Sequence, residues 1–257
     1  MGIEVFAKHI REKRAVKIET GFNNTDLNSV SKICSAAQNA KASAVDIVAS
    51  KEVYDVARKN TKLPIFVSSI HPFDILEAVK WGVDAVEIGK YDDFYTKGIK
   101  FSETEFYDIV LETIGLINQY DVYTSVVIPG YFDISQQVAL AKKFELLGIN
   151  LIQIEGVQPL KLRKFTSYIK DSNISIENTF EINKMTKLPI ITSMNVDSKN
   201  LNEAFLSGAS GLNIDNLAKF DTEIAMTTEI RKIVGSISHR NSLNRELVRS
   251  QIELAFN

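Results

Sequence analysis

Short runs of apolar and β-branched residues recur along the chain, and each is followed by a stretch whose apolar residues have helical spacing. The runs number eight and recur at intervals of roughly 20 to 35 residues. Eight strands that alternate with helices predict parallel pairing through right-handed crossovers, and eight such units close a (β/α)8 barrel. The expected strands cover residues 15–19, 44–49, 64–69, 85–89, 123–129, 151–156, 189–193 and 211–215.

Residues at the ends of the expected helices support this division of the chain. Glycine suits a left-handed cap after a helix, and Gly82, Gly148 and Gly208 each precede an expected strand. Ser102 and Glu105 have the spacing of a capping box, which predicts a helix that starts directly after Ser102. The helix-to-strand boundaries are therefore marked by the residues that such boundaries need.

The pattern predicts one α/β domain over residues 1–257, a single (β/α)8 TIM barrel with eight units over about 15–234. Two connections are long, at 91–101 and 157–187, and we expect the second to hold two helical pieces. A further helix is expected over residues 242–256, after the eighth unit.

Composition narrows the classes of partner. The chain has a formal net charge of −2, which offers no electrostatic footprint for nucleic acid or an anionic membrane, so we expect neither. Its single cysteine, Cys34, excludes an internal disulfide and is expected in the core. No apolar run approaches the roughly 20 residues of a membrane span, and we expect no signal or transit peptide. A small-molecule partner and a homo-oligomer both remain open.

Charged residues occupy strand positions that face the barrel interior. Alternate residues of a strand share a face, and apolar Val16 and Ile18 suit the helix side, which leaves Lys17 inward. Gln153 and Asn213 face inward by the same rule. Buried charges are costly unless they are paired, protonated or bound to a metal. One carboxylate is expected inward from each of five strands: Glu19, Asp46, Glu87, Glu155 and Asp215.

These inward charges allow several interpretations. Crowding raises the pKa of one carboxyl and makes it a general acid or base, with Glu19, Glu87 and Glu155 as candidate catalytic residues. Asp46 is then the orienting partner. Two or three carboxylates would also suit a hard cation such as Mg²⁺. Lys17 is an ion-pair anchor or a Schiff-base nucleophile, and nearby acids favour the anchor because they raise its pKa. The remaining interpretation is an interior whose charges are paired for structural reasons.

Further candidates lie at the carboxyl ends of the strands, where such barrels hold their active sites. His71 is either an acid–base residue at this rim or a capping residue, and segment 91–95 is a lid, a subunit contact or simple loop packing. The sequence carries no flavin, nicotinamide or haem signature, no Walker loop and no Cys/His metal spacing. The candidate substrate-binding residues are Gly21, Asn23, Ser68, Gly156, Ser193, Asn213 and Asp215.

Several segments together resemble one family, the hypothetical chloroplast open reading frame twenty-three of algal plastids and cyanobacteria. Its members are described as uncharacterised, so the resemblance implies a barrel fold and a plastid-stromal home, or a cyanobacterial cytoplasm, but no reaction. The most specific part is VEIG followed by D-x-F-Y, with IQ-x-EG some distance later. The segments are VKIETGFNN, AVDIVAS, LPIFVSSIHP, AVEIGKYDDFY, QQVALAKKFELLGINLIQIEG, LPIITS, GASGLNIDN and IAM.

The chain departs from that family's pattern after the last two strands. The family pattern is similar to S-G after strand seven and G-V-G-V-G-S after strand eight. In many barrels these turns hold a phosphate through backbone N–H groups, and glycine permits the close approach. Here the turns read Ser193-Met194-Asn195 and Asn213-Ile214-Asp215-Asn216. We therefore expect no phosphate at this place.

Two functions of different classes follow from the sequence. The first is an enzyme of lyase or isomerase type that acts on a small polar metabolite by proton transfer at the acidic strand ends. The second is a barrel without catalysis that serves as a regulatory or scaffold protein. The replaced glycines favour the second, and the inward carboxylates favour the first.

Overall fold

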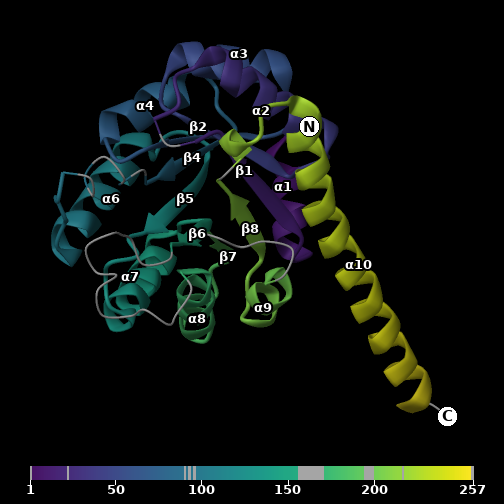
Figure 1. The fold of residues 1–257 in the computed structure, drawn as a ribbon. Coiled ribbons are helices and arrows are strands. Elements are labelled where there is room, and N and C mark those ends of the chain that lie inside the picture. The colour runs from purple at the N-terminus through teal and green to yellow at the C-terminus, as the bar shows by residue number, and fades with distance from the viewer. Residues whose placement is uncertain are drawn as a thin grey trace.

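The eight strands form one closed barrel in which sequential neighbours pair in parallel and β1 pairs with β8 (Figure 1). The computed structural model describes residues 2–21, 23–89, 91, 94, 97–155, 171–193, 200–215 and 217–255. All eight strands lie within the predicted runs, which overrun them by at most two residues at either end. They are β1 (Ala15–Glu19), β2 (Ala44–Val48), β3 (Ile65–Ser69), β4 (Ala85–Ile88), β5 (Tyr123–Ile128), β6 (Leu151–Ile154), β7 (Ile190–Thr192) and β8 (Gly211–Ile214).

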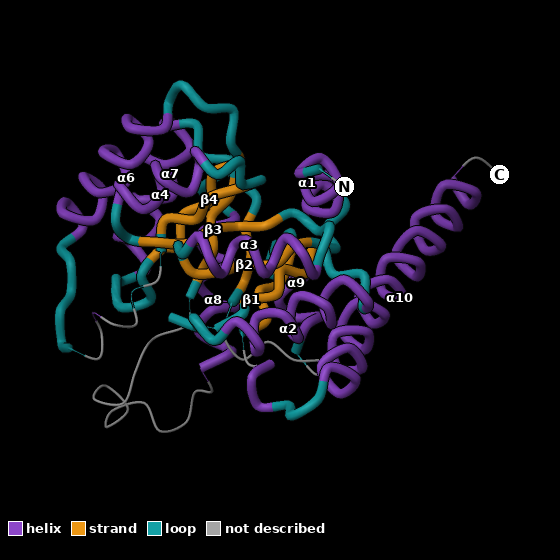
Figure 2. The backbone as a smooth tube through the Cα atoms, turned by 90° about the horizontal axis from the view of Figure 1, so that it is seen from above, coloured by secondary structure: helices purple, strands orange, loops and turns teal. Residues whose placement is uncertain are grey.

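Helices surround the strands on the outside, so the barrel wall is covered by their apolar faces (Figure 2). This arrangement confirms the predicted (β/α)8 architecture. The helices are α1 (Ile3–Arg11), α2 (Leu27–Asn39), α3 (Lys51–Asn60), α4 (Pro72–Lys80), α6 (Glu103–Ile117), α7 (Ile134–Leu147), α8 (Asp171–Asn183), α9 (Leu201–Leu206), the 3-10 turn η1 (Leu217–Lys219) and α10 (Glu223–Ala255).

The predicted helix boundaries are confirmed in detail. Ser102 caps α6 in a capping box with Glu105, whose carboxylate accepts a hydrogen bond from the Ser102 backbone N–H. Gly82, Gly148 and Gly208 have φ angles of 80°, 80° and 108°, which is the left-handed region where a side chain is strained. These glycines allow the chain to turn sharply from helix to strand, which keeps the repeat short.

The helix α1 was not predicted, and it closes the amino-terminal end of the barrel. Phe6 and Ile10 are buried, and the Phe6 ring lies 4.9 Å from that of Phe66 inside the barrel. The signal was present in the spacing of Ile3, Phe6 and Ile10 along one helix face. Together these apolar residues fill the basal part of the interior: Phe6, Ile10, Ala15, Ala44, Phe66, Ala85, Leu151 and Ile191.

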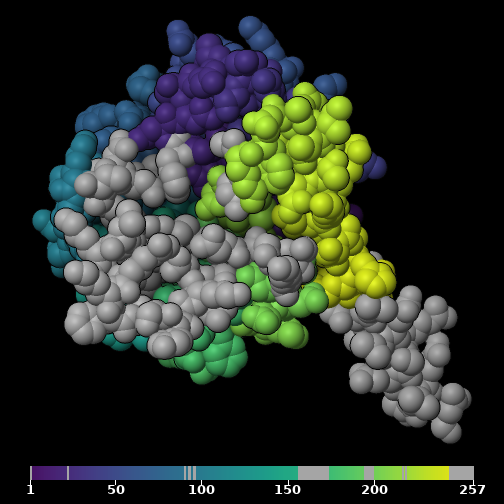
Figure 3. Space-filling view, in the orientation of Figure 1, coloured from purple at the N-terminus to yellow at the C-terminus, as the bar shows by residue number. Residues whose placement is uncertain are grey.

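The expected C-terminal helix is present, but it is continuous with the helix of the eighth unit. Residues 223–255 form the single helix α10, because neither proline nor glycine interrupts the chain after Gly235. Its first part packs on α2, and Figure 3 shows the two side by side. Of the two helical pieces expected over 157–187, α8 is one, and residues 156–170 lie outside the described part of the chain.

A matched pair of glycines tests the barrel packing. A Cβ at Gly211 would lie 2.7 Å from the Ala15 Cβ and 2.9 Å from the Ala15 carbonyl oxygen, whereas a Cβ at Gly235 would meet nothing within 4 Å. We expect Gly211→Ala to lower the free energy of unfolding by about 1–3 kcal/mol, since β1 must shift. Gly235→Ala, on the exposed face of α10, should raise it by about 0.5–1 kcal/mol. Urea denaturation measures both, and equal effects would contradict this account.

Candidate functional site

A lysine and two carboxylates meet in the barrel lumen above the basal apolar layer. The Lys17 Nζ lies 2.6 Å from an oxygen of Glu87 and 3.2 Å from one of Asp46. These residues come from β1, β4 and β2, so the lysine side chain crosses the lumen to reach Glu87. Lys17 and Asp46 are fully buried, and Glu87 is 2% exposed. We call these three residues the lumen triad.

Hydroxyl groups complete the hydrogen bonding of the lumen triad. Ser68 on β3 donates to the second oxygen of Asp46 at 2.5 Å, and Ser125 on β5 donates to Glu87 at 2.8 Å. Ser68 had been singled out from the sequence, whereas Ser125 had not. The register between β4 and β5 would have identified Ser125, because it pairs directly with Glu87.

The electrostatics of the lumen triad raise the pKa values of both Glu87 and Lys17. Burial raises the pKa of Glu87 to about 7, with the charge of Asp46 adding to the rise and that of Lys17 opposing it. For Lys17, burial lowers the pKa, but the carboxylates of Glu87 and Asp46 outweigh it and the pKa is raised. The amine therefore stays protonated at neutral pH while the Glu87 carboxyl is divided between its two forms.

A second cluster lies beside the lumen triad. The Asn213 side chain on β8 donates to Glu19 at 3.0 Å and lies 3.3 Å from the Ser193 hydroxyl. Glu19 and Asn213 are 5% and 2% exposed. Among the described residues, the side-chain oxygens of Asn213 and Gln153 are buried and have no hydrogen-bond partner. Buried acceptors of this kind are suited to a donor group from a bound molecule.

The other predicted site residues lie farther out. Glu155 follows β6, is half-buried and accepts a hydrogen bond of 3.3 Å from the Gly130 backbone N–H. Asp215 is half-buried directly after β8. Gly21 follows β1 with a φ angle of 112°, and Asn23 is exposed. Among the described residues none of these four belongs to the lumen triad. Gly156 and the turn residues Met194, Asn195 and Asn216 lie outside the described residues.

The weaker candidates lie outside the lumen triad. His71 is exposed at the start of α4, where it occupies the capping position without a side-chain cap bond. Cys34 is buried in the core, and burial raises the pKa of its thiol to about 12. Tyr91 is buried and donates to the Val127 carbonyl at 2.6 Å, as a packing residue does. Asp92, Asp93 and Tyr95 of the same segment lie outside the described residues.

The described ranges contain no group of three or more His, Cys, Asp or Glu placed to hold a metal ion. Asp46 and Glu87 instead have Lys17 as their cation. Mg²⁺ binding therefore stays a hypothesis from the sequence. Across the same described part of the chain, no helix is both long enough and apolar enough to cross a bilayer.

Comparison with known proteins identifies the family of this barrel. A family described as "Protein of unknown function (DUF561)" matches residues 4–243. The chain belongs to this family. The "Uncharacterized protein ycf23" of Antithamnion sp. is 31% identical over 241 residues, covering 89% of this chain and 86% of that protein. The ycf23 protein of Cyanophora paradoxa is 30% identical over 237 residues, covering 90% and 94%. The resemblance noted in the sequence is thereby confirmed.

Solved structures similar to this DUF561 chain support the fold alone, since their sequence identities are low. The geranylgeranylglyceryl phosphate synthase of Thermoplasma acidophilum, in complex with its substrate sn-glycerol-1-phosphate, has a TM-score of 0.60 at 13% identity, covering 92% of this chain and 98% of that chain. A thiamine phosphate pyrophosphorylase from Pyrococcus furiosus has a TM-score of 0.54 at 15% identity, covering 89% and 98%. Small-metabolite enzymes thus share this architecture.

Proposed function

We propose that this DUF561 protein is an enzyme that moves a proton to or from a small polar metabolite, with Glu87 as the exchanging group. One observation carries the proposal: the Glu87 carboxyl is buried in the lumen between the Lys17 amine and the Ser125 hydroxyl, and burial raises its pKa to about 7. A general acid or base works best when its pKa lies near the operating pH. A buried site of this kind is also a candidate functional site on general grounds.

The neighbours of Glu87 fit that role. Lys17 stabilises the ionised carboxylate at 2.6 Å, and Ser125 fixes its orientation through a hydrogen bond of 2.8 Å. Asp46 accepts a second hydrogen bond from the lysine amine, at 3.2 Å. Since the raised pKa of Lys17 keeps its amine protonated, the residue serves as an anchor and electrostatic partner, and a Schiff base at this amine is disfavoured.

The substrate in this proposal reaches Glu87 from the carboxyl ends of the strands. Asn213 and Gln153 offer unpartnered buried acceptors among the described residues, suited to hydroxyl or amine groups of a metabolite. Glu19, Ser193, Glu155 and Asp215 surround this end as further polar contacts. The architecture shared with enzymes such as 3-hexulose-6-phosphate synthase, at a TM-score of 0.57, agrees with a small-molecule substrate.

The test is a carboxyl titration followed by a ligand screen. Carbon-13 NMR should show Glu87 titrating near neutral pH, and titration below pH 5 would remove the basis of the proposal. A thermal-shift screen of plastid metabolites, with and without Mg²⁺, should then find a stabilising ligand. A ligand at 100 times its Kd adds about 2.7 kcal/mol. Glu87→Gln should abolish turnover of that ligand, whereas Glu52→Gln on the exposed face of α3 should not.

A second candidate function is a barrel without catalysis that acts as a regulatory or scaffold protein. The observation that favours it is the completeness of the lumen triad, in which Lys17 pairs with both buried carboxylates. Such a network is also what a purely structural polar interior requires. The effect of Glu87→Gln on the free energy of unfolding distinguishes the two candidate functions.

We expect no inorganic phosphate to bind at the ends of β7 and β8 at millimolar concentration. Asp215 adds negative charge where a phosphate would lie, and at 4–5 Å this costs a few kcal/mol at an effective dielectric near 20. Asp215→Gly should therefore create or strengthen binding, by about fivefold or more. The backbone amide NMR signals of Ser193 and Asn213 provide a local readout. Equal phosphate-induced shifts in the parent chain and the variant would contradict the prediction.

The proposal also includes a subcellular location. The ycf23 names of the relatives, and the plastid-bearing algae among their sources, favour the plastid stroma, with a cyanobacterial cytoplasm as the alternative. Immunolocalisation in the source cell would decide between them and any other compartment.

A further inference from the structure

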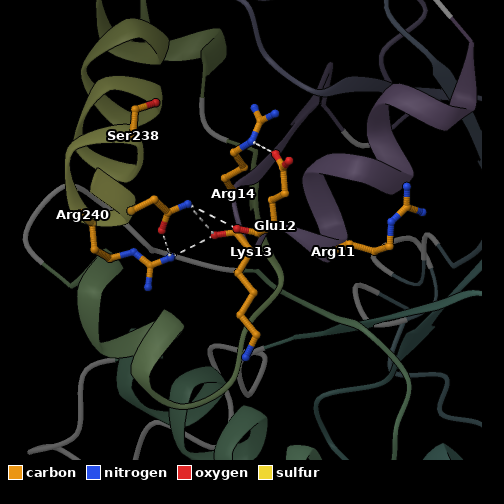
Figure 4. A pocket seen from close by; sticks show the side chains of 7 residues that line it. Arg11, Glu12, Lys13, Arg14, Ser238 and Arg240 are labelled. Atoms are coloured by element: carbon orange, nitrogen blue, oxygen red, sulfur yellow. Dashed lines mark hydrogen bonds and ion pairs between the residues drawn. The ribbon is translucent and has the colours of Figure 1, made fainter. Parts of the chain in front are cut away.

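A positively charged pocket lies at the amino-terminal end of the barrel, opposite the strand ends that carry the proposed active site. It has a volume of about 730 Å³ and lies between the α1–β1 turn and α10 (Figure 4). Pockets for small molecules have volumes of about 300–1,000 Å³. We call it the basal pocket, and its lining residues are Arg11, Glu12, Lys13, Arg14, Ser238, Arg240 and Asn241.

The lining carries four cationic side chains and one carboxylate. That carboxylate is already neutralised, because Glu12 accepts a hydrogen bond of 2.5 Å from Arg14. Within the described residues, neither Arg11 nor Lys13 has an ion-pair partner. The chain as a whole has a formal charge of −2, so this surplus of positive charge is local. Such a pocket attracts anions.

Arg240 is held in place before any ligand arrives. One guanidinium nitrogen donates to the Lys13 carbonyl at 2.9 Å and to the Asn241 side chain at 2.7 Å. The guanidinium also stacks at 4.0 Å from the centre of the Phe205 ring. Its Nε is buried and has no hydrogen-bond partner among the described residues. A pre-oriented arginine with donors to spare is well suited to phosphate oxygens.

The backbone of Lys13 adds a further sign of a constrained site. Its φ angle is 51°, in the left-handed region that residues with a side chain rarely adopt. This turn directs the Lys13 carbonyl to Arg240, and the lysine side chain lines the pocket. Figure 4 shows Arg240 extending from α10 to the turn, with Arg11 at the edge away from α10, whereas the Ser238 hydroxyl donates to the Val234 carbonyl of its own helix. The cations are therefore spread along the pocket.

From these observations we infer that the basal pocket binds a small molecule with two or more phosphate groups. A single phosphate would contact only part of the cations that line the basal pocket, whereas a chain of phosphates offers several anionic groups to them. The ligand would bridge the amino-terminal helix and the carboxy-terminal helix, two elements far apart in the sequence. This site is separate from the lumen triad and does not depend on the proposed reaction.

The test uses inorganic tripolyphosphate as the probe and the full chain at constant ionic strength. Lys13→Gly removes one cation and relieves the left-handed backbone, so the variant should fold. Lys41→Gly is the matched control, since Lys41 is also exposed, also left-handed at a φ of 60°, and outside the pocket. Calorimetry should show that Lys13→Gly weakens tripolyphosphate binding about tenfold or more, while Lys41→Gly changes it less than about twofold.

A second variant and two further probes distinguish the possible ligands of the basal pocket. Arg11→Gln should also weaken binding, and inorganic phosphate should bind at least about tenfold more weakly than tripolyphosphate. No binding at 1 mM probe, or equal weakening in Lys13→Gly and Lys41→Gly, would overturn the inference. A short RNA that binds more tightly than tripolyphosphate and is weakened by both lysine variants would also overturn it, because a macromolecular surface would then be the explanation.

Discussion

Replacement of Lys17 by methionine is expected to lower the free energy of unfolding at pH 8 by about 3–5 kcal/mol. Lys17 is the cation that both Asp46 and Glu87 contact inside the barrel, and all three are buried. Methionine has a similar length but no charge, so it leaves the two carboxylates facing each other in a medium of low polarity. Urea denaturation followed by circular dichroism measures the loss.

Two further variants make this prediction specific. Lys51→Met removes an exposed lysine that pairs with Asp55 on α3, and should cost no more than about 0.5 kcal/mol. The triple variant Lys17→Met, Asp46→Asn, Glu87→Gln removes the charges together and should recover much of the lost stability. A Lys17→Met variant as stable as Lys51→Met would mean that the buried charges do not depend on one another.

Replacement of Glu87 by glutamine is expected to stabilise the protein by about 3 kcal/mol at pH 8 and by less than about 1 kcal/mol at pH 5. The folded chain raises the pKa of this carboxyl from 4.5 to about 7, so the folded state binds its proton more tightly than the unfolded state does. Stability from this group is therefore present below about pH 4.5 and falls as the pH rises to about 7. Glutamine is neutral throughout and avoids that loss.

The measurement is the free energy of unfolding between pH 4.5 and 8 for the parent, Glu87→Gln and the exposed control Glu52→Gln. The decline over this interval should be smaller in Glu87→Gln, and Glu52→Gln should follow the parent. Stabilisation at pH 8 would mark a carboxylate that the fold does not need, as expected of a functional group. Strong destabilisation would show that the ionised carboxylate is a structural partner of Lys17 and would favour the scaffold function.

The fold could be predicted because each strand is short, apolar and bounded by recognisable residues. The positive φ angles of Gly82, Gly148 and Gly208 and the capping box at Ser102 follow from local chemistry alone. Closure of β1 on β8 followed from the number of strands. The helix α1 was missed because it precedes the first repeat. The end of the eighth helix was misplaced because polar residues alone do not terminate a helix.

The site was only partly predictable. Strand alternation correctly predicted that Lys17, Asp46 and Glu87 point into the barrel. The ion pairs agree with the expected role of Lys17 as an ion-pair anchor. Alternation does not show how far along the barrel axis a side chain lies, however. It therefore could not distinguish these buried residues from Glu155, which lies beyond the end of its strand. It also gave no register between β4 and β5, and for that reason Ser125 was not recognised. Which of the carboxylates act in a reaction remains a prediction.

The pairing of β1 with β8 has a consequence for synthesis of the chain. β1 leaves the ribosome early, and its partner β8 follows roughly 190 residues later, which at 5–20 residues per second takes roughly 10–40 s. Throughout that interval the outer edge of β1 has unpaired N–H and C=O groups, and such an edge can pair with another chain. Completion of the ring by residues 211–214 therefore ends the period in which the nascent protein is most exposed to aggregation, and chaperone contact should be concentrated before that point.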